Sequence, residues 1–184
     1  RTTRSAAPGS REGKHRLMVR TFETRVYLPM SVEAYIELRM DLCFQEFCAS
    51  WENQILEIEL KETDDGSVHR VVNKKFKENP VPPLLRGLAS AVGATPATMA
   101  FALEERFNPQ RFSQSSPMSV SARLPGALSE VVLIESQQWV ESIDDGQRCV
   151  LCAQHEVTAR MRAVGSTLEK QLESRIRLSY DKIP

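Results

Sequence analysis

The sequence lacks any apolar stretch of the ~18–20 residues that a membrane-spanning helix needs. It also lacks an excess of charge, since 24 basic side chains balance 24 acidic ones, and a net charge of +0 gives no electrostatic argument for binding nucleic acid. Cysteines are few: four in 184 residues are too sparse for a disulfide scaffold. We therefore expect a reducing compartment. The length of 184 residues indicates a single domain with a full apolar core.

Recognisable catalytic and metal-binding sets are also missing. Cys149 and Cys152 form a CxxC pattern, but they lie in a strand-like stretch, where side chains three residues apart point to opposite faces. No histidine has a nucleophile and an acid arranged beside it in the sequence, although a partner supplied by folding is not visible there. We expect no metal, no cofactor and no enzymatic activity.

The strongest positive pattern is at the C-terminal end. Apolar side chains recur every four residues at Leu168, Leu172, Ile176 and Tyr180, which predicts one apolar stripe on a helix over 164–183. Ser166 and Glu169 have the spacing of a capping box at the start of this helix. The stripe must pack on the preceding chain, which has mostly the alternation typical of strands.

The preceding chain predicts a strand over 15–28, a helix from the N-cap Ser31 to about residue 50, and then about six strands. Two turns contain Asp-Gly, a pair that tolerates the positive φ of hairpins. A Ser-rich stretch at 112–124 contains Pro117 and is expected at a sheet edge. The six later strands are expected at 54–62, 68–77, 98–107, 112–124, 130–142 and 148–161.

This order resembles the helix-grip fold of the START-like superfamily, also called the SRPBCC or polyketide-cyclase and lipid-transport superfamily. The opening FETRVYLPMSVEAYIEL, a strand running into a capped helix, carries the resemblance at one end. The closing CVLCAQHEVTARMRAVGSTLEKQLESRI, a strand, a glycine-containing turn and a helix, carries it at the other. The resemblance implies an α+β domain over 15–184, with a curved antiparallel sheet of about seven strands wrapped around the C-terminal helix.

The resemblance also implies a cavity between sheet and helix that holds a lipid or another apolar small molecule. His155 is the one histidine on the apolar face of its strand, where it either bonds a ligand headgroup or is satisfied within the core. Leu84, Leu85 and Leu88 either form a gate that touches a membrane or a partner, or pack in the core. The candidate lining residues, for which ordinary core packing is an equal alternative, are Trp139, His155, Met161, Leu172, Ile176 and Tyr180.

Residues 1–14 are basic and nearly free of acids, like the remnant of an organellar transit peptide or a plain disordered tail. We therefore expect an organellar protein, soluble or peripheral to a membrane, with the chloroplast favoured over the mitochondrion. The leading hypothesis is non-enzymatic binding of an apolar molecule. The alternatives are an accessory structural subunit of a photosynthetic or respiratory membrane complex, held through residues 1–14, and a cyclase- or hydrolase-like enzyme.

Overall fold

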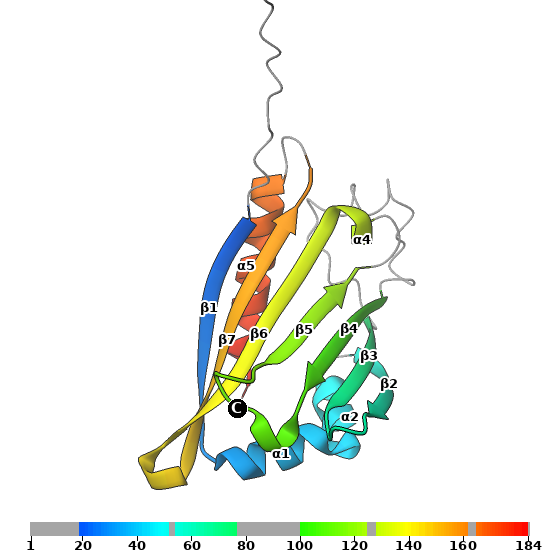
Figure 1. The fold of residues 1–184 in the computed structure, drawn as a ribbon. Coiled ribbons are helices and arrows are strands. Elements are labelled where there is room, and N and C mark those ends of the chain that lie inside the picture. Colours follow the sequence, from blue (N-terminus) through cyan, green and yellow to red (C-terminus); the bar gives the residue numbers. More distant parts are fainter. Residues whose placement is uncertain (1–18, 52–53, 77–99, 125–127, 162–164, 184) are drawn as a thin grey trace, which may run out of the picture.

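The computed structural model describes residues 19–51, 54–76, 100–124, 128–161 and 165–183. Within these ranges seven strands form one sheet in the order β1-β7-β6-β5-β4-β3-β2, with every neighbouring pair antiparallel (Figure 1). The strands are β1 (Val19–Leu28), β2 (Gln54–Glu62), β3 (Val68–Phe76), β4 (Ala100–Phe107), β5 (Met118–Arg123), β6 (Val132–Ile143) and β7 (Arg148–Ala159).

Helices follow the first strand and the last. Figure 1 shows the long C-terminal helix running along β1 and β7, with the two N-terminal helices at one end of the sheet. This arrangement confirms the predicted α+β helix-grip fold. The helices are α1 (Val32–Met40), α2 (Leu42–Trp51), the single turn α4 (Leu128–Val131) and α5 (Gly165–Tyr180), with short 3-10 turns at Pro109–Arg111 and Asp144–Gly146. No helix among the described residues is long and apolar enough to cross a membrane.

The predicted helix from Ser31 to about residue 50 is two helices. Ser31 is the N-cap of α1, and its hydroxyl accepts a hydrogen bond from the Ala34 amide at 3.2 Å. Asp41 then ends α1 in an extended conformation, and its carboxylate accepts bonds from the Cys43 and Phe44 amides at the start of α2. An aspartate that caps the second helix therefore interrupts a continuous helical pattern.

Helices α1 and α5 cover the same face of the sheet, which we call the inner face. From α5, the Arg177 guanidinium lies 4.9 Å from the centre of the Phe22 ring, and the Tyr180 ring lies 5.2 Å from the His155 ring. The main core cluster includes Met118, Val140 and Leu151, and four side chains of α1 pack against it: Val32, Tyr35, Ile36 and Met40. Strand residues alternate, so every second side chain of β3 to β7 points toward these helices.

The Ser-rich stretch does not form an edge. Its strand, β5, lies between β4 and β6 in the middle of the sheet. Pro117 precedes the first residue of β5 and so removes no hydrogen bond from the ladder. The expectation of an edge strand is therefore wrong, because the proline lies outside the paired segment.

The start of α5 is fixed by close packing against the end of β7 rather than by a capping box. The Glu169 carboxylate is buried and accepts a hydrogen bond from the Ala159 amide of β7 at 2.9 Å. Gly165 lies so close to the same residue that an added Cβ would be 2.6 Å from the Ala159 carbonyl oxygen. Ser166 is exposed. These contacts, rather than the Ser166 and Glu169 spacing, orient α5 on the inner face.

We predict that Gly165→Ala lowers the free energy of unfolding by about 1–3 kcal/mol, because the new methyl group would overpack against a backbone carbonyl. The neighbouring Ser166→Ala is the matched control and is expected to change stability little, because Ser166 is exposed. Urea unfolding followed by circular dichroism measures both. A larger loss for Ser166→Ala would restore the capping box as the determinant of the helix start.

Candidate functional site

A charged cluster lies on the inner face between α1 and the middle strands. The Glu105 carboxylate of β4 accepts a 2.7 Å hydrogen bond from an Arg39 terminal nitrogen and another of 2.7 Å from Arg70 Nε. Arg70 also donates from a terminal nitrogen to the same carboxylate oxygen. Only 1% of the Arg70 surface and 4% of the Glu105 surface are exposed. Arg70 and Glu105 are thus removed from water together, whereas 21% of the Arg39 side chain stays exposed.

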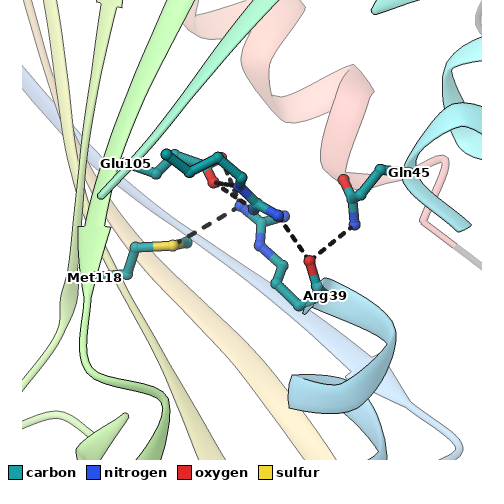
Figure 2. Close-up of polar contacts among 5 residues, drawn as sticks. Arg39, Gln45, Glu105 and Met118 are labelled. Carbon is teal, nitrogen blue, oxygen red and sulfur yellow. Dashed lines mark hydrogen bonds and ion pairs between the residues drawn. The ribbon is translucent and has the colours of Figure 1, made fainter. Parts of the chain in front are cut away.

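Arg70 also ties β3 to the end of α1. Its second terminal nitrogen donates to the Arg39 carbonyl oxygen at 2.7 Å. That carbonyl is in the last turn of α1, where helix oxygens lack intrahelical partners and the helix dipole favours a cation. Figure 2 shows the Arg39 side chain extending from α1 toward the Glu105 and Met118 side chains of the neighbouring strands.

The cluster carries a net positive charge. Burial raises the pKa of Glu105, but the Arg39 and Arg70 guanidinium groups lower it by more than burial raises it. The pKa of Glu105 is therefore below its ordinary value. Glu105 is therefore ionised and offsets one of the two arginines. One positive charge is left within the protein at this point.

Two polar side chains in this region have hydrogen-bonding capacity that no described residue uses. Arg39 Nε is buried and has no partner among the described residues. Gln138, 9% exposed on the inner face of β6, is in register with Met118 of β5 and Ala153 of β7. No hydrogen bond joins its amide to another described residue. Because buried polar groups are nearly always hydrogen-bonded, Arg39 Nε marks a place where a partner is missing.

Aromatic side chains border the cluster. Tyr35 of α1 stacks on Phe112 with ring centres 6.5 Å apart, and Phe107 contacts the same ring at 5.8 Å. Burial raises the pKa of Tyr35 and of Tyr180, so both hydroxyls stay protonated at neutral pH. The positive charge therefore faces neutral aromatic side chains and Met118 rather than a second anion.

His155 occupies the other end of the inner face and is only 2% exposed. Its Nε2 lies 2.9 Å from the Thr24 hydroxyl and its Nδ1 lies 2.7 Å from the Ser136 hydroxyl, so one ring nitrogen donates and the other accepts. Burial, with a smaller contribution from the Arg177 charge, lowers the pKa of His155 to about 4. The histidine is neutral and internally satisfied, and nothing in this geometry leaves a nitrogen for a ligand.

The structure brings five of the six candidate lining residues to the inner side of the sheet. Met161 and Leu172 pack together around Val132 and Leu168. Tyr180 joins the main core cluster and contacts His155. Ile176 lies on α5 between Leu172 and Tyr180. Their role in binding stays a prediction.

Trp139 lies elsewhere. It is paired with Cys152 on the outer face of the sheet, and its indole nitrogen donates to the Glu141 carboxylate at 2.9 Å. It therefore does not line the space beside α5. The stretch Glu130–Ser142 has large apolar groups at both parities, and the alternation alone did not show which parity faces inward.

The cysteines do not converge. Cys149 is buried on the inner face and Cys152 on the outer face, as expected from their spacing. Cys43 and Cys48 are both exposed on α2. No group of three or more His, Cys, Asp or Glu that could hold a metal occurs in the described part of the chain. The candidate gate Leu84, Leu85 and Leu88 and the basic tail 1–14 lie outside the described residues, so the predicted location and assembly stay predictions.

Two hollows of ligand size occur among the described residues. One of about 540 Å³ is on the outer face and is lined almost entirely by polar side chains such as Ser119, Ser121 and Gln137. The other, of about 420 Å³, lies between α1 and the 109–113 turn and is lined in part by Val32, Ile36 and Phe112. The second adjoins the aromatic border of the charged cluster, because Phe112 stacks on Tyr35.

None of the protein-family models and none of the curated proteins matches the sequence. Solved structures match by fold. The Zhui aromatase/cyclase from Streptomyces sp. R1128 has a TM-score of 0.57 at 12% identity, over 89% of this chain and 89% of that chain. Ara h 8.0201 has 0.50 at 9% identity, over 89% and 94%. Norcoclaurine synthase from Thalictrum flavum has 0.47 at 13% identity, over 89% and 85%. The START-like helix-grip resemblance is thereby confirmed at the level of the fold.

The expectation that the chain is not an enzyme is wrong as an inference from this fold, because the fold is shared with an aromatase/cyclase. The expectation relied on the absence of a local motif. In this protein the polar groups come together from α1, β3, β4 and β6, which are distant in sequence. A site assembled in this way leaves no spacing that a sequence motif could record.

We predict that Glu105→Gln costs about 3–5 kcal/mol of folding stability, because it leaves the buried Arg70 guanidinium and the part-buried Arg39 guanidinium without an anion. Glu104→Gln, at the next residue, is the matched control. Glu104 also pairs with two arginines, but Arg106 and Arg123 are exposed on the outer face, so a much smaller loss is expected. Urea unfolding at pH 7 compares the two variants, and equal losses would contradict the importance of burial.

We predict that stability falls with acid through His155. The imidazole titrates near 6.5 in the unfolded chain and near 4 in the folded protein. Between these pH values the unfolded state binds more protons, so the free energy of unfolding decreases as the pH falls from about 6.5, and the decrease levels off below about 4. The total change due to this group is on the order of 2–3 kcal/mol.

His155→Gln removes the titrating group and keeps an amide that can bond the two hydroxyls. The difference in unfolding free energy between wild type and this variant is expected to vary with pH over this window. Parallel pH profiles for wild type and His155→Gln would show that the histidine is not the group responsible.

Proposed function

We propose that the protein binds a hydrophobic small molecule carrying one polar group, in the space between the inner face of the sheet and helices α1 and α5. The observation that supports this most directly is the buried Arg39 Nε, which has no hydrogen-bond partner among the described residues although the Met118 sulfur and the Tyr35 and Phe112 rings lie nearby. A few convergent polar groups in an apolar setting are typical of small-molecule sites.

The hollow between α1 and the 109–113 turn is the mouth in this proposal. It has the size of a small ligand, about 420 Å³, and Ile36 and Phe112 connect it to the core cluster. Phe112 lines this hollow together with the charged side chains of Glu33 and Arg111, and its ring stacks on Tyr35 of α1. The outer-face hollow is not favoured, since its polar side chains already pair with one another.

The test uses Nile red, a neutral dye that fluoresces in apolar surroundings, with native mass spectrometry of the protein from its source as a second readout. We predict saturable dye binding and at least a tenfold loss of affinity in Ile36→Trp, which narrows the mouth. Leu133→Trp adds the same bulk on the outer face of β6 and should leave binding unchanged. Absence of binding to wild type, or equal effects of the two variants, would refute the proposal.

A further inference from the structure

The charge balance of the Arg39, Arg70 and Glu105 cluster determines what kind of polar group the ligand carries. Both oxygens of Glu105 are occupied: Arg39 donates to one, and Arg70 donates twice to the other. The one carboxylate offsets one positive charge, and a second remains.

The remaining charge is associated with Arg39 rather than Arg70. The three nitrogens of Arg70 are all engaged, two with Glu105 and the third with the Arg39 carbonyl oxygen. Arg39 has one terminal nitrogen on Glu105, with Met118 Sδ as a weak further acceptor at 3.8 Å, and its buried Nε has no partner among the described residues. An unpaired donor on a cation is costly to bury, so an anionic acceptor would be favourable there.

The neighbouring side chains do not supply that acceptor. Tyr35 is one helical turn before Arg39, and burial raises the pKa of this tyrosine, so its hydroxyl is neutral and supplies no anion, and Arg39 Nε has no bond to it. Tyr180 is likewise kept protonated by burial. Met118 is apolar apart from its weak sulfur acceptor. Around the cation the walls are thus aromatic and apolar, which suits the body of an organic anion better than a hydrated inorganic one.

We infer that the natural ligand is an organic monoanion, an apolar or aromatic molecule with one carboxylate, whose charged group is bound by Arg39. This inference rests on the proposed function and specifies the ligand class of the same site. Arg70 and Glu105 act as positioning residues, since they hold the Arg39 guanidinium against the inner face. A single carboxylate would offset the positive charge that Glu105 leaves on Arg39.

The experiment compares two probes of the same shape that differ in charge, 2-naphthoate and 2-naphthamide, with decanoate and decanamide as an aliphatic pair. Isothermal titration at pH 7 measures their affinities for the full chain. We expect the carboxylates to bind about tenfold or more tightly than the amides, because a hydrogen bond to a charged acceptor is the stronger one. Nile red binding is measured on the same samples.

Arg39→Gln is expected to abolish the preference for the carboxylate while Nile red still binds. Arg39→Lys should retain part of the preference, because it keeps the charge but not the planar guanidinium. Arg123→Gln removes an exposed cation from the outer face and is the matched control, expected to have no effect. Thermal unfolding of each variant verifies that it is folded. If Arg39→Gln is unfolded, Arg39→Lys is compared with the wild type instead.

The outcomes separate the two proposals. Nile red binding without a carboxylate preference in wild type, or a preference that survives in both Arg39 variants, would overturn the anionic ligand and leave the binding function intact. Failure of Nile red and of all four probes to bind wild type would overturn the binding function, and the anionic ligand with it.

Discussion

The ion cluster around Glu105 is the interaction on which the arrangement of this interior depends. One carboxylate on β4 joins the adjacent strand β3 through Arg70 and helix α1 through Arg39. Arg70 in turn bonds the last-turn carbonyl of α1. Because the energy of buried charges depends steeply on geometry, the cluster fixes where α1 lies on the sheet more narrowly than apolar contact alone would. The position of Tyr35 and of the hollow beside α1 follows from that placement.

The two ends of the inner face are built on different principles. At the α5 end, His155 is neutral and both of its nitrogens are engaged by hydroxyls, so the polar group is closed within the core. At the α1 end, the polar groups are charged, two arginines share one glutamate, and Arg39 Nε has no partner among the described residues. A satisfied buried network makes a core rigid, whereas an unsatisfied one identifies a place for a further partner. The α1 end is therefore the candidate functional end of the inner face, although the sequence pattern pointed to His155.

Periodicity predicted the elements that have a long repeating apolar pattern. It missed the features that depend on a single side-chain contact. The stripe from Leu168 to Tyr180 and the alternation of β7 are long patterns, and both elements formed as expected. Asp41 divides one predicted helix because a single side chain caps α2. Glu169 bonds Ala159 rather than a cap, which only the packing of α5 on β7 reveals.

The candidate site had one usable signal in the sequence: charged residues at positions whose neighbours in alternation are apolar. Arg70 stands between Val68 and Val72, and Glu105 between Leu103 and Phe107; the two face each other in the register of β3 and β4. That pairing was not visible without the sheet, and Arg39 comes from a helix. The fold shared with the aromatase/cyclase fixes the scaffold at 12% identity but not these side chains. The chemistry of the site thus follows from this chain's own charges: apolar burial would supply most of the affinity, and the unbalanced arginine would select the ligand.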